Sequence, residues 1–131
     1  ESTFGIRCTL EPLEWKLLFP KITAGDFHVG GMTWEPWIND PIYTLNAFRD
    51  VKEPINFPKW ENKQYQGIMH LAEKEINRQK RKSYYLQAEK ILLDEMPVMP
   101  VFLVKAPAFK KKNFRLQYAS PFINFKWGYF T

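Results

Sequence analysis

Apolar residues recur at every second position in several segments of the chain, which is the period of a strand with one buried face. The pattern is clearest over residues 4–10, where Phe, Ile, Cys and Leu alternate with Gly, Arg and Thr. It predicts a strand in which Cys8 is a buried, small hydrophobic residue. A weaker alternation over 27–33 predicts a second strand, interrupted by two glycines. A nearly continuous apolar run over 98–104 predicts a strand buried on both faces, and 122–130 predicts a final strand.

Helical spacing of apolar residues dominates the middle of the chain. Residues 65, 68, 69, 72 and 76 are apolar and fall at i, i+3, i+4, i+7 and i+11, so they predict an amphipathic helix over 62–79. The basic run Lys80-Arg81-Lys82 interrupts the pattern, and the apolar residues that follow predict a second helix over 81–95. Because the connection is short, we expect the two helices to pack antiparallel.

Two shorter helices are predicted upstream. Residues 14–24 carry apolar side chains at roughly helical spacing, although Pro20 is expected to shorten or kink this helix. Asp40 followed by Pro41 resembles a helix start, with Asp40 as the N-cap and Pro41 at the first helical position of a helix over 42–49. Strands mixed with helices indicate an α/β or α+β fold.

The composition narrows the class of protein. A chain of 131 residues with 45% hydrophobic and 17% aromatic residues indicates one folded domain rather than a disordered segment. A net charge of +5 would assist approach to an acidic surface without identifying the partner. The single cysteine excludes an intramolecular disulfide. No apolar run is as long as the about 18 residues that a membrane-spanning helix requires. The chain begins at Glu1 directly in a strand-like pattern, so we expect it to belong to a longer protein.

Residues typical of catalytic or metal sites are few and scattered. His70 and Glu73 lie one helical turn apart, but on a mostly solvated helix face, which disfavours a role as metal ligands. Glu35 and Asp40 could act as paired carboxylates, yet no nucleophile motif, phosphate-binding glycine loop or zinc helix completes a catalytic site. We therefore expect no enzyme, no metal and no cofactor.

Basic residues raise a second hypothesis, a small nucleic-acid-binding module. The runs 80–82 and 110–112 are basic, and such a module would bind in a strongly salt-dependent manner. Both runs lie in predicted connections with acidic residues nearby, which favours solvated faces and no nucleic-acid partner. A third hypothesis is an autonomous protein-interaction domain, which would fold cooperatively without a partner.

The segment 30–41 places Trp34 and Trp37 between glycines and prolines, in a stretch too interrupted for a helix or a continuous strand. Two aromatic side chains on irregular backbone suit the wall of a binding site, because ligand pockets are largely apolar with a few polar groups. The same residues could instead plug a loop against the core. The sequence leaves both interpretations open.

The order of several motifs resembles the later part of bacterial extracytoplasmic solute-binding proteins of family 5, which serve oligopeptide and dipeptide ABC importers. The resemblance covers almost the whole chain, and its most diagnostic part runs from Gln87 to Pro100. The motifs that carry it are Leu13-Glu14-Trp15-Lys16, Ala24-Gly25-Asp26-Phe27, Trp34, Asn39-Asp40-Pro41, Tyr84 to Val101, and Phe125-Lys126-Trp127.

The resemblance implies a C-terminal lobe fragment of a two-lobed periplasmic-binding-protein (type II) fold, with a mixed sheet flanked by helices. Residues 1–121 would form part of the C-terminal ligand-binding lobe, and 122–131 a strand returning toward the missing N-terminal lobe. The implied function is capture of a peptide or peptide-like ligand between the lobes and delivery to the permease subunits. The implied location is periplasmic or extracytoplasmic, with lipid anchoring as one option.

The resemblance also implies a ligand site. The segment Thr33-Trp34-Glu35 would line the cleft and pair its backbone with an extended peptide, with Trp34 forming one pocket wall. An Asp that holds the ligand's ammonium in well-known members is replaced here by Trp37, which attracts a cation more weakly. Glu35 or Asp40 would substitute if turned inward, although a cap role for Asp40 is favoured. This departure leaves open a non-peptide ligand such as a metal complex, haem or a cell-wall peptide. The full set of candidate site residues is Thr33, Trp34, Glu35, Trp37, Asn39 and Asp40.

Overall fold

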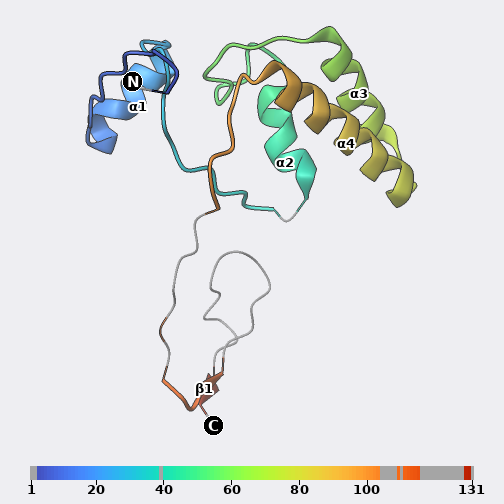
Figure 1. Ribbon diagram of the computed structural model, residues 1–131. Coiled ribbons are helices and arrows are strands. Elements are labelled where there is room, and N and C mark those ends of the chain that lie inside the picture. Colours follow the sequence, from blue (N-terminus) through green and yellow to red (C-terminus); the bar gives the residue numbers. More distant parts are fainter. Residues whose placement is uncertain (1–2, 39, 104–108, 110, 116–128, 131) are drawn as a thin grey trace. The chain divides into compact units, whose positions relative to one another are not determined.

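Figure 1 shows the computed structural model of the chain, which describes residues 3–38, 40–103, 109, 111–115, 129 and 130. The chain divides into two compact units, Glu1–Gly31 and Met32–Thr131. The described secondary structure is mainly helical. No helix within the described ranges combines the length and the apolar character that crossing a membrane requires.

The first unit contains one helix, α1, which spans Trp15–Ala24 and confirms the helix predicted over 14–24. The helix continues through Pro20, so the expected shortening does not occur. It ends at Gly25, whose left-handed backbone (φ 76°) allows the N–H groups of residues 25 and 26 to cap Ile22 and Lys21. Ile22 is the buried residue of this helix.

The core of the second unit lies between α3 (Lys63–Lys74) and α4 (Arg78–Glu95), which pack side by side in Figure 1. The apolar positions predicted from spacing supply its centre, since Tyr65, Met69 and Ala72 of α3 face Tyr85, Ala88 and Leu92 of α4 in one buried cluster. This antiparallel packing confirms the predicted helical pair.

The helix predicted over 42–49 is confirmed as α2 (Pro41–Leu45) followed by the 3-10 turn η1 (Asn46–Phe48). Pro41 stands at the first helical position, where its missing N–H costs nothing. The α2 helix contacts α4, and the Tyr65 hydroxyl of α3 donates a 2.7 Å hydrogen bond to the Leu45 carbonyl. These contacts join α2 to the helical pair.

The predicted boundary between the two long helices is wrong. The α3 helix ends at Lys74 rather than 79, so Ile76 lies in the connection and is 92% exposed. The α4 helix begins at Arg78, and the basic run at 80–82 therefore lies within its first turns. The reason is local hydrogen bonding, because the Asn77 side chain caps the N–H groups of Gln79 and Lys80 and fixes the helix start.

The strands predicted over 4–10, 27–33 and 98–103 are absent from the described residues. Cys8 is exposed rather than buried, and Leu103 is 95% exposed. A strand needs a neighbouring strand and a face to bury, and the described part of the chain supplies neither for these segments. Val104 lies outside the described residues.

The described sheet consists of one antiparallel pair. Strand β1 (Phe114–Arg115) pairs with β2 (Tyr129–Phe130), with Phe114 opposite Phe130 and Arg115 opposite Tyr129. The strand predicted over 122–130 is confirmed at its last two residues, and 122–128 lie outside the described residues. A mixed sheet flanked by helices is not found among the described residues.

Candidate functional site

The segment that carries the predicted ligand residues precedes α2. Within it, the Trp34 indole N–H donates to the Thr44 hydroxyl at 3.2 Å, and the Trp34 ring lies 6.2 Å from the Tyr43 ring, centroid to centroid. The ring also packs against the buried helical cluster while remaining half-buried. Trp34 is therefore anchored on α2 as a plug, and its role in ligand contact stays a prediction.

The neighbouring candidates differ from Trp34 because they face solvent. Thr33, Glu35 and Trp37 are exposed, and Trp37 is 70% exposed. Glu35 forms no ion pair with any described basic side chain. Asn39 lies outside the described residues. The structure thus places Thr33, Glu35 and Trp37 on one exposed stretch whose backbone is not used by a described helix or strand.

Asp40 is the N-cap of α2, as the sequence predicted. Its Oδ1 accepts a 3.0 Å hydrogen bond from the Ile42 N–H. The pKa of the Tyr85 phenol is raised by burial first, and then by the negative charge of the nearby Asp40 carboxylate, which disfavours ionisation of the phenol. Because the Asp40 carboxylate already caps α2 and lies near Tyr85 of α4, it is poorly placed to serve as the ammonium-binding carboxylate.

Replacing Asp40 separates its two roles. Asp40→Ala is expected to lower the free energy of unfolding by about 1 kcal/mol through loss of the cap. Asp40→Asn should retain most of the cap, because its amide oxygen still accepts from Ile42, and should lower the Tyr85 pKa by removing the negative charge. Denaturant unfolding and a spectrophotometric titration of tyrosine would measure the two effects. An unchanged Tyr85 pKa in Asp40→Asn would contradict the proposed interaction.

The sequence did not anticipate Thr44 and Tyr43 as partners of Trp34. No periodicity rule links position 34, which precedes the helix, to positions 43 and 44 within it. The only available signal was the predicted helix start at Asp40-Pro41, which places residues 43 and 44 in the first turns of α2.

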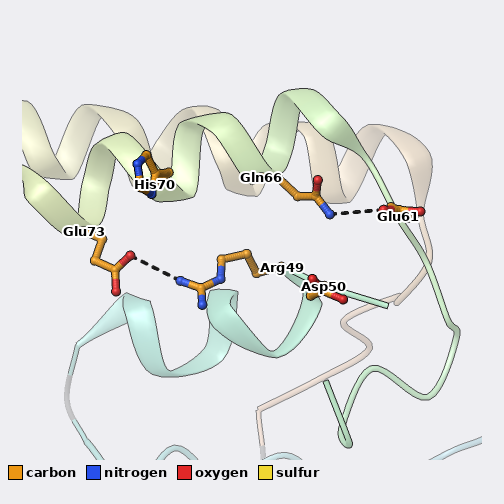
Figure 2. A pocket seen from close by; sticks show the side chains of 6 residues that line it. All are labelled: Arg49, Asp50, Glu61, Gln66, His70 and Glu73. Carbon is orange, nitrogen blue, oxygen red and sulfur yellow. Dashed lines mark hydrogen bonds and ion pairs between the residues drawn. The ribbon is translucent and has the colours of Figure 1, made fainter. Parts of the chain in front are cut away.

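A polar pocket of about 360 Å³ lies elsewhere in the second unit, between α3 and the segment that follows η1. Gln66, His70 and Glu73 line it from one face of α3, at positions i, i+4 and i+7. Figure 2 shows the Arg49 guanidinium reaching toward Glu73, with an N–O distance of 3.3 Å, and Gln66 facing Glu61. Asp50 completes the lining.

The polar groups of this pocket largely satisfy one another. His70 and Glu73, the pair noted in the sequence, both line the pocket. The Glu73 carboxylate forms its ion pair with Arg49. Among the described residues, no group of three or more His, Cys, Asp or Glu side chains is arranged to hold a metal ion. The pocket therefore resembles a solvated hollow held by an ion pair more than a ligand site.

Comparisons with known proteins connect the chain to binding proteins. It is 32% identical over 102 residues to the oligopeptide-binding protein OppA of Bacillus subtilis, a match that covers 78% of this chain and 19% of OppA. It is 26% identical over 130 residues to the dipeptide-binding protein DppE of the same organism, covering 98% of this chain and 24% of DppE. The homologues of this chain include oligopeptide- and dipeptide-binding proteins.

Other homologues carry different names. The chain is 32% identical over 98 residues to the probable deoxycholate-binding periplasmic protein YgiS of Escherichia coli, covering 75% of this chain and 18% of YgiS. No protein-family model matches the chain. The chain spans about a fifth to a quarter of the length of the three curated relatives named above.

A solved structure shows the same fold. The pheromone receptor PrgZ, whose structure describes its mode of peptide binding, matches 99% of this chain and 25% of its own length with a TM-score of 0.75 and 22% identity. The chain thus shares its fold with a segment of PrgZ. The family resemblance seen in the sequence is confirmed by these relatives.

Proposed function

We propose that the chain is part of the extracytoplasmic substrate-binding component of an ABC importer, which captures peptides between two lobes and delivers them to the permease. It would perform no chemistry. The observation that carries this proposal is the similarity to OppA and DppE over 78% and 98% of the chain. The periplasmic names of other homologues support an extracytoplasmic location.

Within such a protein, residues 1–121 would contribute to the C-terminal lobe and 122–131 to a strand that returns toward the N-terminal lobe. The exposed apolar segments support this placement. Residues 4–10 and 98–103 have the composition of strands but expose large hydrophobic side chains in the described structure. Segments elsewhere in the longer protein would cover these side chains and complete a mixed sheet.

The proposed ligand contact lies at Thr33, Trp34 and Glu35, with Trp37, Asn39 and Asp40 as secondary candidates. An extended peptide can pair with an exposed backbone, and the resulting hydrogen bonds give affinity that is independent of peptide sequence. Thr33 and Glu35 are exposed on backbone outside the described helices and strands. Trp34, held by Thr44, would present its exposed part as a fixed pocket wall.

Backbone pairing at this segment predicts a specific effect of proline. Thr33→Pro removes the N–H of residue 33 and is expected to weaken peptide binding about tenfold or more, since proline cannot donate to a strand ladder. Thr33→Ala keeps the N–H and is the matched control, with an expected change below about threefold. Tryptophan fluorescence of the longer protein, titrated with short peptides, measures both. Equal affinity of both variants would exclude pairing at residue 33.

Recognition of the peptide amino terminus is tested with the same titration. Peptides with free and acetylated amino termini distinguish an acidic ammonium site from an uncharged one. If Glu35 replaces the family's Asp, acetylation and Glu35→Gln should each weaken binding, and their effects should not add. Binding indifferent to acetylation would assign end recognition to Trp37. No binding of any peptide would contradict the proposed peptide function.

A second candidate function is capture of an amphipathic, non-peptide ligand. It is favoured by the 32% identity to YgiS and by the exposed ring of Trp37 at the position of the expected carboxylate. An indole face suits the apolar face of a steroid-like molecule better than a peptide ammonium. Saturable binding of deoxycholate, with no response to peptides, would establish this alternative.

A further inference from the structure

Positive charge is concentrated where α3 and α4 meet. We call residues 74–82 the hairpin tip. It contains five basic residues and one acidic residue, a net of 5 − 1 = +4 against +5 for the whole chain. Figure 1 shows this connection at one end of the helical pair. The basic residues are Lys74, Arg78, Lys80, Arg81 and Lys82.

Most of this charge is available to a partner. The one acidic residue, Glu75, pairs with Lys80 at 3.1 Å. Lys74, Arg78 and Lys82 are exposed and form no ion pair with any acidic side chain in the described part of the chain. Besides Lys80, the tip contains four positive charges, on Lys74, Arg78, Arg81 and Lys82. These charges lie close together in the sequence and repel one another, and an anionic surface would relieve that repulsion.

An apolar side chain stands among these cations. Ile76 is 92% exposed, and the turn that carries it is held by its neighbours. The Asn77 N–H donates to Glu75 Oε1 at 2.9 Å, and the Asn77 side chain caps α4. The hairpin tip therefore presents a hydrophobic residue on an ordered turn, with basic residues on both sides of it in the sequence.

We propose that the hairpin tip binds an anionic phospholipid surface. The basic side chains would contact headgroup phosphates while Ile76 enters the boundary between headgroups and acyl chains. The exposed isoleucine favours a membrane over a nucleic acid, which binds through phosphate contacts and aromatic stacking. This inference is independent of the ligand assigned to the segment 32–40.

The test measures binding of the full chain to phosphatidylcholine vesicles with and without phosphatidylglycerol, by co-sedimentation. Binding is expected only to the vesicles that contain phosphatidylglycerol, and it should fall as salt increases. Each basic residue near such a surface contributes about fivefold in affinity, so Arg78→Glu with Lys82→Glu should weaken binding about 25-fold or more.

Two further variants separate a specific site from net charge. Lys111→Glu with Lys112→Glu changes the net charge by the same amount at two exposed residues outside the tip, and should weaken binding much less. Ile76→Asn leaves the charge unchanged and should weaken binding roughly fivefold, because it removes a side chain that enters the apolar boundary. Circular dichroism confirms that each variant retains its helices.

Three results would overturn the proposal. Equal binding to both kinds of vesicle would show no preference for anionic lipid. Equal losses from the two double variants would reduce the effect to net charge. Binding of soluble polyglutamate in place of vesicles, unaffected by Ile76→Asn, would assign the tip to an acidic protein surface instead.

Discussion

Replacing Tyr65 with alanine is expected to lower the free energy of unfolding by about 3–5 kcal/mol, the range for removing a large buried aromatic side chain. Tyr65 is fully buried, and its ring lies 5.0 Å from the Trp60 ring in an edge-to-face arrangement. Its hydroxyl donates to the Leu45 carbonyl at 2.7 Å. The substitution would open a cavity at the junction of α2 with the helical pair. Denaturant unfolding followed by circular dichroism measures the loss.

Tyr65→Phe isolates the contribution of the hydroxyl. The ring still fills the core, but the Leu45 carbonyl loses its donor, so we expect a loss of about 1–3 kcal/mol. A loss for Tyr65→Ala no larger than that for Tyr65→Phe would contradict the assignment of Tyr65 to the centre of the core.

The unsubstituted chain and Tyr65→Phe should also differ in how their free energy of unfolding depends on pH. Burial raises the pKa of the Tyr65 phenol above its ordinary value. Above about pH 10 the unfolded chain releases this proton and the folded chain retains it, so the free energy of unfolding falls as pH rises. Below about pH 10 the group is protonated in both states and contributes no pH dependence. Tyr65→Phe should therefore lose stability less steeply at alkaline pH than the unsubstituted chain.

Replacing Asn56 with alanine is expected to lower the free energy of unfolding by about 2–4 kcal/mol, because it takes the side-chain partner from the Trp60 N–H and carbonyl and one of two donors from the Asp50 carbonyl. Asn56 is fully buried in the segment between η1 and α3. Its amide nitrogen donates to the carbonyls of Asp50 at 2.9 Å and Trp60 at 2.8 Å, and its oxygen accepts from the Trp60 N–H at 3.2 Å. The loop from Asp50 to Trp60 would lose the side-chain hydrogen bonds that hold its two ends together.

Asn46→Ala is the matched control, since it removes the same chemical group from the same unit. The buried Oδ1 of Asn46 has no hydrogen-bond partner among the described residues, so this substitution is expected to cost less than about 1 kcal/mol. Asn56→Asp provides a second check. Its carboxylate would face two carbonyl oxygens, so the variant should be less stable at neutral pH than near pH 4, where the protonated acid can donate. Similar losses for Asn46→Ala and Asn56→Ala would contradict the assigned network.

The segment closed by Asn56 also places Trp60 for a contact across the helical pair. The Trp60 indole N–H donates to Glu95 at 2.7 Å, and the Asn62 amide donates to the same carboxylate. Asn62 in turn caps α3 through the Tyr65 N–H. No pattern in the sequence indicates that position 56 should bury an amide. Its importance comes from three groups brought together only by the fold of the loop.

The helices were the most predictable part of the fold. The amphipathic spacing of residues 65–72 and 84–92, and the cap at Asp40-Pro41, act within a few residues of the chain. Physical rules of short range therefore located these helices and their buried faces. Helix boundaries depended on competing local hydrogen bonds, so the end of α3 at Lys74 and the exposure of Ile76 were not anticipated.

The candidate site was predicted only in part. The sequence indicated that Asp40 caps a helix and that Trp34 and Trp37 lie on irregular backbone, and the structure agrees. It left open whether Trp34 plugs the core, and packing on Tyr43 and Thr44 shows that it is anchored there. The ligand role of these residues remains a prediction, because the proposed cleft has a second wall that this chain does not supply.

The sequence by itself determined which segments form helices, which of their faces are buried, and the relationship to peptide-binding proteins. These properties depend on local periodicity, capping and residue identity, all of which can be inferred along the chain. Tertiary structure decided the conformation of the alternating segment at 4–10 and of the apolar run at 98–103, the partners of Trp34, and the network around Asn56. A strand or a buried amide requires partners distant in sequence, and the identity of those partners is decided only when the chain is folded.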